Sequence, residues 1–349
     1  MIEIVGSCER RIFGLAPAER LARQRGASPG PVLVADASAV LGDTTVGWLL
    51  ENPGTIVTTP AGRPVAVAAA PDAVDAARAA LAGTAQLPRI NPATMDEMFV
   101  RKLRRRDRLL VRSVDEQPLP RVERELFDSV YKGVTDLVTK YAWPLPAFWV
   151  TRAAARLRIP PNAVTVVGIL LMFLAAYLWL EAELWAGLAA AWGMTFLDTV
   201  DGKLARVTVT SSELGNLLDH VTDMIHPPLW WLCLAVGLAA TSPAGELVWA
   251  SCWVIIGTYV VGRVLEKATK ARLGYNPFLW QRFDSRFRLI VSRRNIILLL
   301  MTIGLVVGQP VAAFAACAVW SVVSVVVQAV RYAQAVRATR AGASESWLM

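Results

Sequence analysis

The sequence predicts an all-α polytopic membrane domain of about six transmembrane helices, preceded by a small soluble α/β domain. Of its 349 residues, 55% are apolar, which is more than a soluble domain usually contains, and nearly all the long apolar runs lie after Pro161. We therefore expect a soluble cytoplasmic domain over 1–115, a linker with an interfacial juxtamembrane helix over 116–160, and the membrane domain over 161–349.

The N-terminal region alternates strand-like and helix-like segments, which is typical of a small α/β domain. Strands are predicted at 31–36, 54–59 and 64–69, and helices at 16–26 and 70–83. A glycine-rich nucleotide loop with its Arg or Lys is not found in this region. We therefore predict a non-catalytic domain that serves dimer contacts or regulation.

The residues that lead up to the membrane domain combine basic and aromatic side chains. The run RKLRRRDR at 101–108 predicts a linker that lies on anionic lipid. Residues 127–159 mix Lys and Arg with the aromatic residues Tyr141, Trp143, Phe148 and Trp149. This mixture suits an interfacial helix on the lipid headgroups, and an ordinary linker helix explains it equally well.

Six apolar segments follow and are predicted to cross the membrane, at 164–180, 184–197, 224–240, 247–265, 296–307 and 311–330. A spanning helix needs about 20 residues. The second, third and fifth segments are therefore long enough only if their polar ends belong to the helices. The fifth segment is the weakest of the six.

The charges of the loops predict the orientation. From Arg263 to Arg294 there are nine Lys or Arg residues, whereas the loops on the opposite side hold Glu181, Glu183 and Glu246 and no basic residue. The positive-inside rule then places both termini and the Asp-rich turn between spans two and three on the cytoplasmic side of the inner membrane. The first fifteen residues do not read as a cleavable signal, which agrees with this orientation.

Composition weighs against two other kinds of site. The net charge of +8 could suggest nucleic acid, but its location in the loops favours a membrane surface. Three of the four cysteines, Cys233, Cys252 and Cys317, fall in apolar runs, and Cys8 stands alone. Because no pair has the spacing of a metal or redox site, we interpret them as small apolar packing residues.

Four aspartates interrupt this apolar sequence at regular intervals. Asp198 and Asp201 lie on the same face of one predicted helix as Gly202 and Ala205, which follow at i+4 and i+7. On the next helix, Gly215, Asp219 and Asp223 share one face at i, i+4 and i+8. The short connection makes the two helices antiparallel neighbours, so the two acidic faces can meet around one cavity.

Carboxylates packed this closely repel one another unless cations are present. Oxygen ligands without a nearby cysteine favour Mg²⁺ or Mn²⁺ over zinc. Such ions usually complete their coordination with substrate phosphates, so a nucleotide pyrophosphate is a natural ligand. Gly202, Ala205 and Gly215 would let it approach the backbone, and Arg206 could reach a phosphate oxygen. The plainer alternative is a solvated loop between two spans.

These residues together resemble the signature of the CDP-alcohol phosphotransferase (phosphatidyltransferase) family at all eight of its positions: Asp198-x2-Asp201-Gly202-x2-Ala205-Arg206-x8-Gly215-x3-Asp219-x3-Asp223. The resemblance extends over about 150–332 and includes PPNAVT before the first span. In this family a Pro-Asn-x-x-Thr stretch helps to hold the nucleotide, which implies this role for Asn162 and Thr165. Pro and Asn are also common at the start of any helix, whatever its function.

The resemblance implies a displacement at phosphorus. Asp198, Asp201 and Asp219 would hold two Mg²⁺ or Mn²⁺ ions that bridge the CDP pyrophosphate, and Asp223 would bind metal and act as general base on the acceptor hydroxyl. The hydroxyl attacks the β-phosphorus and CMP leaves. Two metals suit an in-line displacement, and a base must lie within hydrogen-bond reach of its proton. Relatives also imply a homodimer that contacts membrane lipids.

The acceptor site is less defined by the sequence. Arg288, Arg293 and Arg294 lie where the fifth span begins, and Arg forks suit phosphate oxygens, so they predict a site for a phosphate on the acceptor. Topogenic charge or lipid contact is the alternative. His226, close to the Asp223 face, could contact the acceptor or orient a carboxylate, or could be structural.

Several interpretations of the substrates remain open. The donor could be CDP-diacylglycerol with a polar alcohol as acceptor, or a soluble CDP-alcohol such as CDP-inositol. A faint resemblance of the N-terminal region to reduced nucleotidyltransferase-like domains, which are fused to some members that handle inositol phosphates, favours inositol-phosphate chemistry. The rival interpretations are a divalent-cation transporter that uses the aspartates as its ion site and a pseudoenzyme scaffold.

Overall fold

The computed structural model describes residues 1–26, 30–340 and 346–348, and for Leu214, Asn216 and Asp219 it describes the backbone alone. The chain forms two compact units. The first contains Met1–Lys132, Phe148–Pro160 and Gly202–Ser211, and the second contains Gly133–Ala147, Pro161–Asp201 and Ser212–Met349. The N-terminal strands and the apolar helices thus belong largely to different units.

The first unit is built on a five-stranded sheet in the order β1-β2-β5-β4-β6. Its strands are β1 (Ile2–Val5), β2 (Val32–Asp36), β4 (Ile56–Thr58), β5 (Pro64–Ala69) and β6 (Arg89–Ile90). β2 pairs with β1 in parallel and with β5 antiparallel, while β4 pairs with β5 antiparallel and with β6 in parallel. The three predicted strands are confirmed as β2, β4 and β5.

Helices cover both faces of this sheet: α1 (Pro17–Arg25), α2 (Asp43–Glu51) and α3 (Val74–Leu81). Leu33 and Ala35 of β2 pack in one cluster with residues of α1 and α2. Val32 and Val34, which point the other way, pack with Ala77 and Ala80 of α3. Because both faces are buried, β2 reads as a continuous apolar run rather than an alternating one. The predicted helices are confirmed as α1 and α3.

Shorter elements complete the first unit. β3 (Ala39–Leu41) pairs with β9 (Val111–Ser113), and β7 (Met98–Val100) pairs with β8 (Arg105–Asp107). The remaining elements are α4 (Leu119–Ser129) and 3₁₀ turns at Pro71–Ala73, Pro92–Thr94 and Arg101–Leu103. The basic run 101–108 is therefore part of a hairpin, and the expectation of a linker at these residues was wrong. The charge pattern of the run could not predict this pairing, because the pairing depends on β7, which lies outside the run. Contact of the run with lipid stays a prediction.

The juxtamembrane region is helical, as expected. A π-helical turn at Val138–Ala142 leads into α5 (Pro144–Arg156). On α5 the apolar side chains Leu145, Trp149 and Val150 are exposed. Exposed aromatic and aliphatic side chains beside Arg152 suit the lipid interface, and this placement stays a prediction.

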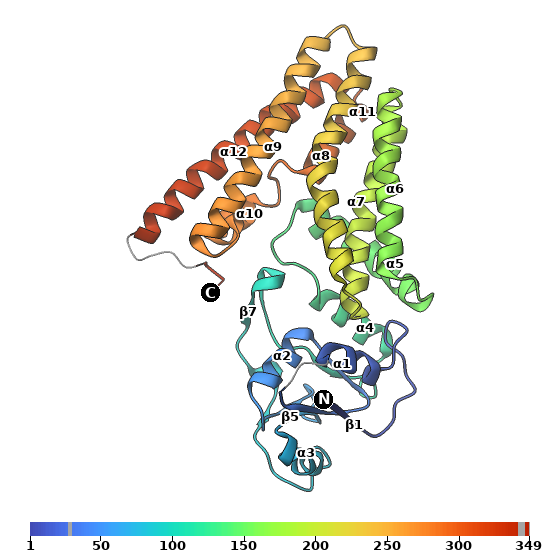
Figure 1. Cartoon of the computed structure of the whole chain (residues 1–349), viewed down its shortest axis with the longest axis vertical. Coiled ribbons are helices and arrows are strands. Elements are labelled where there is room, and N and C mark those ends of the chain that lie inside the picture. Colours follow the sequence, from blue (N-terminus) through green and yellow to red (C-terminus); the bar gives the residue numbers. More distant parts are fainter. Residues whose placement is uncertain (27–29, 341–345, 349) are drawn as a thin grey trace. The chain divides into compact units, whose positions relative to one another are not determined.

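The second unit is helical. Its helices are α6 (Pro161–Leu180), α7 (Leu184–Val207, whose last turns belong to the first unit), α8 (Glu213–Thr241), α9 (Gly245–Leu273), α10 (Arg282–Phe287), α11 (Arg294–Val306) and α12 (Pro310–Arg340), with a 3₁₀ turn at Pro277–Leu279. α8 packs against α6 and α9, and α12 packs against α9 and α11 (Figure 1). Five of the six predicted apolar segments lie within helices, and the fifth, 296–307, extends one residue beyond the end of α11.

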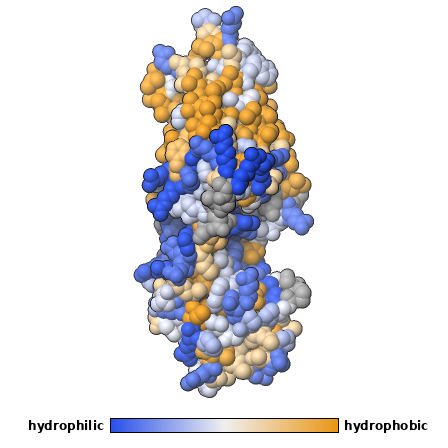
Figure 2. All heavy atoms as spheres, turned by 90° about the vertical axis from the view of Figure 1, so that its left-hand side faces the viewer, coloured by the Kyte–Doolittle hydropathy of each residue, from blue (hydrophilic) through white to orange (hydrophobic). Residues whose placement is uncertain are grey.

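The chain is a multi-pass membrane protein. Among the described residues, four helical segments are long and apolar enough to cross a bilayer: Pro161–Leu180, His220–Thr241, Gly245–Leu273 and Pro310–Arg340. The second and fifth predicted spans correspond to α7, which continues into the charged signature, and to the shorter α11. Figure 2 shows hydrophobic side chains over the helical bundle, where Trp253, Val260 and Val326 are among the exposed residues. Exposed apolar side chains of this kind are expected where lipid replaces water as the solvent.

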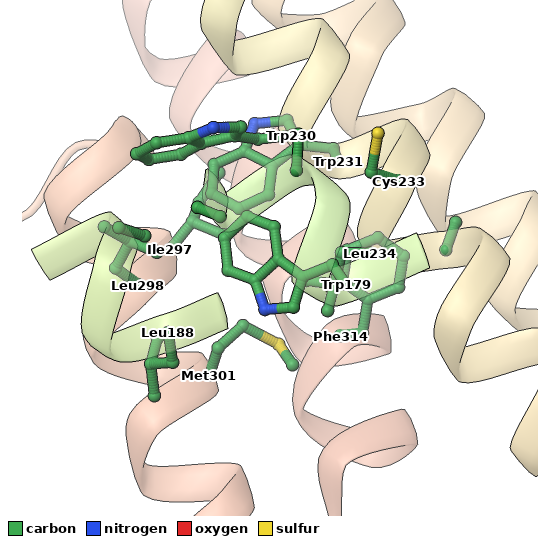
Figure 3. Packing of buried hydrophobic residues seen from close by; sticks show 14 of the residues in the cluster. Trp179, Leu188, Trp230, Trp231, Cys233, Leu234, Ile297, Leu298, Met301 and Phe314 are labelled. Atoms are coloured by element: carbon green, nitrogen blue, oxygen red, sulfur yellow. The ribbon is translucent and has the colours of Figure 1, made fainter. Parts of the chain in front are cut away.

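The core of the bundle is aromatic. Trp179 of α6 and Trp230 of α8 meet edge to face with ring centroids 5.5 Å apart, beside Trp231 and Phe314 (Figure 3). A Cβ atom on residue 237 would lie 2.0 Å from the carbonyl oxygen of Trp179, so Gly237 allows α8 to pack closely against the end of α6. Cys233, Cys252 and Cys317 are buried and unbridged, as the sequence predicted.

Candidate active site

The signature occupies two successive helices. α7 runs without interruption from Leu184 to Val207 and so carries Asp198 and Asp201 on its polar end, as the sequence predicted. The chain then turns through Val209, whose φ of +52° is left-handed, and Ser212 caps α8 by accepting a hydrogen bond from Gly215 N at 3.0 Å. The apolar third span therefore extends backwards through Asp223, which the predicted span needed for its length.

Asp198 and Asp223 converge on one cation, the guanidinium of Arg294 at the start of α11. Arg294 Nη2 donates to Asp198 Oδ2 at 2.6 Å, and Nη1 donates to Asp223 Oδ1 at 3.3 Å. The Arg294 side chain is only 16% exposed, so water screens these contacts weakly. The predicted meeting of the two acidic faces is thus observed for these two carboxylates. Asp219 was predicted to join them; its side chain lies outside the described residues.

His226 belongs to the same cluster. Its Nδ1 atom lies 2.7 Å from the Thr222 carbonyl oxygen, and its Nε2 atom lies 3.3 Å from Arg294 Nη1. A carbonyl can only accept and a guanidinium can only donate, so the neutral tautomer with its hydrogen on Nδ1 satisfies both contacts. The ring is almost fully buried and packs edge-on against Trp230. His226 therefore contacts Arg294, the partner of the two carboxylates, whereas the sequence suggested a contact with a carboxylate or with the acceptor.

Asp201 is held by the start of α6. Thr165 Oγ1 donates to Asp201 Oδ2 at 2.7 Å. One turn earlier on α6, Asn162 Oδ1 lies 2.9 Å from the position that a Cβ atom on residue 215 would occupy. The stretch PPNAVT thus contacts both helices of the signature. A small cavity of about 10 Å³, lined in part by Thr165, Asp198 and Asp201, is the size of a single water molecule or ion.

The backbone at Asp223 is unusual. Pro227 and Pro228 lie inside α8 and lack N–H groups, so the carbonyls of Asp223 and Met224 lose their intrahelical donors. The hydroxyl of Tyr259 on α9 lies 3.0 Å from the Asp223 carbonyl oxygen and 3.3 Å from that of Met224. A side chain from another span therefore supplies the hydrogen bond that the prolines remove.

A larger cavity of about 160 Å³ opens beside Asp223. It is lined by residues of α8, α9, α11 and α12, by residues of the turn before α11, and by Asp136. Four arginines line it together with three carboxylates, and these residues are Arg263, Arg288, Arg293, Arg294, Asp136, Asp223 and Glu266. Arg293 pairs with Glu266, and Arg294 with Asp223. The predicted basic residues and His226 thus do border one cavity.

Arg288 differs from the other arginines of this cavity. It is 8% exposed, and within the described part of the chain its Nε and Nη1 atoms have no hydrogen-bond acceptor. Burial lowers the pKa of its guanidinium, and the charge of Asp136 opposes that shift. A buried cation with unused donors that faces a cavity is suited to bind an anion.

Asp136 is held on the wall of this cavity by hydrogen bonds. Its carboxylate accepts from Thr139 N at 2.9 Å, Thr139 Oγ1 at 2.9 Å and Asn295 Nδ2 at 3.0 Å. Burial alone would raise the pKa of Asp136, but the charge of Arg288 and these hydrogen bonds outweigh it and lower the pKa.

Several residues of the cavity were missed by the sequence interpretation, among them Tyr259, Arg263 and Glu266. They lie at i, i+4 and i+7 on α9 and so share one helix face within a span. That spacing of polar residues in an apolar helix could have identified them. Asp136 and Asn295 carry no comparable local pattern.

The rest of the signature lies in the last turns of α7. Gly202, Ala205 and Arg206 belong to the first compact unit, with the N-terminal strands. A Cβ atom on residue 202 would lie 3.2 Å from Arg206 Nη2, so the small residue leaves room for that guanidinium. Their nucleotide-binding role stays a prediction.

Comparison with known proteins relates part of the chain to one family. Residues 158–330 match the model of the CDP-alcohol phosphatidyltransferase family. The chain is 34% identical over 112 residues to an archaetidylinositol phosphate synthase of Pyrococcus horikoshii, covering 32% of this chain and 55% of that protein. It is 38% identical over 98 residues to cholinephosphotransferase 1 of Gallus gallus, covering 24% of this chain and 29% of that protein. The chain thus spans about half or less of the length of these relatives.

Among solved structures, the chain is similar to a phosphatidylinositol phosphate synthase of Mycobacterium tuberculosis with CDP-DAG bound. The identity is 20%, the TM-score is 0.43, and the match covers 53% of this chain and 92% of that one. A structure of the same protein in complex with manganese and citrate is similar at 20% identity and a TM-score of 0.43, covering 53% of this chain and 88% of that one. The family match favours a transferase over a cation transporter.

Proposed function

Because the chain belongs to the CDP-alcohol phosphatidyltransferase family through residues 158–330, we propose that it is a membrane-embedded enzyme that transfers a phospho-alcohol group from a CDP-alcohol to an acceptor hydroxyl and releases CMP. One observation carries this proposal: Asp198 and Asp223, from different helices, converge on a single positive charge. Two carboxylates that already share one positive charge are groups that would be available to bind the metal ions used in phosphoryl transfer.

The chemistry of the carboxylates suits a divalent metal, although among the described residues no three His, Cys, Asp or Glu side chains already lie close enough together to hold one. The guanidinium of Arg294 stands where positive charge is needed between two carboxylates, and an ion-sized cavity adjoins Asp198, Asp201 and Thr165. Asp198, Asp201, Asp219 and Asp223 would hold Mg²⁺ or Mn²⁺, in two sites by analogy with the family. When bound, the ions would neutralise the charge of the pyrophosphate.

The chain's own residues account for orientation and proton transfer. Asn162, Thr165 and Gly215 form the wall against which the nucleotide would lie. Asp223 would accept the proton of the acceptor hydroxyl while the oxygen bonds to the β-phosphorus; the bond from that phosphorus to the bridging oxygen breaks, and CMP leaves with the electron pair. Asp223 faces the larger cavity, so an acceptor bound there lies next to the base.

The chemistry of the larger cavity favours an acceptor that carries a phosphate. Arg288 offers unused donors, and Arg294 would become available if bound metal neutralised Asp198 and Asp223 in its stead. Similarity to an archaetidylinositol phosphate synthase supports an inositol phosphate as that acceptor. The donor would then be a CDP-activated lipid such as CDP-diacylglycerol, with CDP-inositol as the second candidate.

The remaining assignments complete the proposal. Both termini and the active site would lie on the cytoplasmic side, because the basic residues gather in the loops of that side. The α/β domain would be non-catalytic, and the protein would act as a homodimer. Protease accessibility in sealed inner-membrane vesicles tests the orientation, and mass measurement of the detergent-solubilised protein tests the homodimer.

The reaction itself is tested with the purified full chain in lipid nanodiscs. Radiolabelled CDP-diacylglycerol or CDP-inositol is supplied with Mg²⁺ or Mn²⁺ and with inositol, inositol phosphate, glycerol phosphate or serine. We expect CMP release with CDP-diacylglycerol and inositol phosphate. No CMP with any donor, together with metal flux into liposomes, would overturn the proposal in favour of transport.

The acceptor site has a matched pair of variants in one stretch of sequence. Arg288→Ala removes the buried guanidinium of the cavity, whereas Arg286→Ala removes an exposed one nearby. We expect Arg288→Ala to raise the KM for a phosphorylated acceptor by roughly tenfold or more, the size of a charge-assisted hydrogen bond, and to leave the KM of the donor unchanged. Equal effects of the two variants would assign the cluster to membrane topology.

A further inference from the structure

The end of α7, where the signature's Gly202, Ala205 and Arg206 lie, is completed by the N-terminal domain. The last four carbonyls of an α-helix have no intrahelical donor and need other partners. Three are satisfied locally: Leu204 O accepts from Thr208 N, Ala205 O from Thr210 N, and Arg206 O from Val209 N. The carbonyls of Val207 and Thr208 come next.

Two arginines of α1 supply the donors for these carbonyls. Arg20 Nε donates to Val207 O at 3.1 Å, and Arg23 Nη1 donates to Thr208 O at 3.0 Å. These partners are 187 and 185 residues apart in sequence. Positive charge at a helix C-terminus also interacts favourably with the helix dipole. The first helix of the chain therefore caps the helix that carries the signature.

The Arg20 side chain is held in this position by burial and by a second hydrogen bond. It is 1% exposed, and its Nη1 atom donates to Leu41 O at 2.7 Å, at the end of β3. The same side chain thus joins the end of a strand of the α/β domain to the end of α7. Arg23 lies nearer the surface and also pairs with Glu19 at 2.7 Å.

A third contact comes from the end of α4. Lys203 follows Gly202 directly and is 3% exposed. Its Nζ atom donates to Val130 O at 3.1 Å and lies 3.4 Å from the centroid of the Tyr131 ring. Along the last two turns of α7, residues anchored to the N-terminal domain therefore alternate with residues of the signature.

We infer that the N-terminal domain positions the nucleotide half of the signature, with Arg20, Arg23 and Lys203 as positioning residues. This inference rests on the proposed function. The domain itself then needs no catalytic group, because it acts through the end of α7. Loosening α1 should weaken binding of the CDP-alcohol without affecting the acceptor, since the anchored turns carry Gly202, Ala205 and Arg206.

The test uses Arg23, because its partial exposure allows substitution without unfolding the domain. Arg23→Ala removes the hydrogen bond to Thr208, and Arg23→Lys can restore one donor. Arg78→Ala is the control. Arg78 lies on α3 of the same domain and makes two ion pairs, with Glu3 of β1 and with Asp75 of α3. Two properties of the full chain are measured: donor and acceptor KM values, and amide hydrogen exchange of residues 202–212.

We expect Arg23→Ala to raise the donor KM by roughly three- to tenfold, as for the loss of one hydrogen bond, and to speed exchange in 202–212. The acceptor KM should not change, Arg23→Lys should recover most of the effect, and Arg78→Ala should show none. Unchanged exchange in Arg23→Ala, or equal rises in both KM values, would overturn the inference. Absence of CMP release by the unmodified protein would instead overturn the proposed function, while the exchange measurement would still test the anchoring.

Discussion

The Asn162 side chain fills the space that a side chain on residue 215 would need. Asn162 Oδ1 lies 2.9 Å from the position of a Cβ atom built on Gly215, although the two residues belong to different helices. The Ser212 hydroxyl, which caps α8, lies 3.1 Å from the same position. Glycine at 215 thus lets the start of α6 approach the start of α8, and this approach places the Asn162 amide.

We expect Gly215→Ala to impair donor binding rather than folding. The added methyl group displaces the end of a flexible side chain, which is cheap in stability, but it moves Asn162 by a distance on the order of 1 Å, and such shifts can reduce activity by up to 10²-fold. Gly257→Ala on α9 is the control, because nothing lies within 4 Å of its Cβ position. A donor KM that rises equally in both variants, measured beside the melting temperature, would contradict this role.

Asp223→Asn should slow transfer severely and leave the fold intact. An amide cannot accept the proton of the acceptor hydroxyl, and loss of a general base typically costs about 10²–10⁴ in rate. Asp284→Asn is the comparison variant, for which we expect a loss of stability without a loss of activity. Asp284 is buried and accepts from Arg331 at 2.6 and 2.8 Å, away from the Asp223 cavity, so its loss should lower the melting temperature and spare the rate per folded molecule. Substantial CMP release by Asp223→Asn would assign the base elsewhere.

Arg294→Gln should increase the response of the protein to divalent metal. Without the guanidinium, Asp198 and Asp223 repel each other in the metal-free protein, and no internal cation competes with the ion. We expect a lower melting temperature without metal and a larger rise on addition of MgCl₂ or MnCl₂. Arg293→Gln, whose partner is Glu266, is the comparison. Identical metal titrations for Arg294→Gln and the unmodified protein would show that metal does not replace Arg294.

Asp136 should make stability depend on pH in the acid range. Its pKa in the folded protein is lowered, chiefly because the Arg288 charge and the hydrogen bonds from Thr139 and Asn295 overcome the opposing effect of burial. A carboxyl with a depressed folded pKa contributes stability above its unfolded pKa of about 3.9, and this contribution disappears as pH falls through the folded value. The melting temperature of Asp136→Asn should therefore lie below that of the unmodified protein at pH 7.

This difference should shrink as the pH falls below about 4, because Asp136 of the unfolded chain takes up a proton there before the folded carboxyl does. Asp75→Asn is the control, because Asp75 is an exposed carboxyl whose ion pair contributes little. Melting temperatures measured from pH 7 to pH 3 in detergent provide the comparison. A difference for Asp136→Asn that stays constant over this range would mean that the substitution acts through packing rather than charge.

Much of this site could be predicted because helices impose a fixed spacing. The i, i+3 and i, i+4 relations place Asp198 and Asp201 on one face of α7, and the short turn to α8 brings Asp223 opposite. The same local rules anticipated β2, β4, β5 and the polar extensions of α7 and α8. These features depend on neighbours within one or two turns.

Features that depend on distant partners escaped prediction. Arg294 was expected to face an acceptor phosphate, and the structure pairs it with Asp198, 96 residues away, because the packing of α11 brings it there. β8 was hidden in a basic run because its pairing with β7 is a property of two segments. The buried environment of Asp136 likewise arises from α11 and the turn before it, which its own sequence surroundings do not report.

The prolines that follow Asp223 have a consequence for how the two halves of the bundle communicate. The backbone hydrogen bonds of α8 are interrupted at the proposed base, and Tyr259 on the next helix donates to the two carbonyls that the prolines leave without an intrahelical donor. The height and tilt of Asp223 are thus set jointly by α8 and α9. A molecule bound in the cavity along α9 would lie beside Tyr259, whose phenolic oxygen holds the backbone of the proposed base, so we expect its binding to affect the alignment of Asp223.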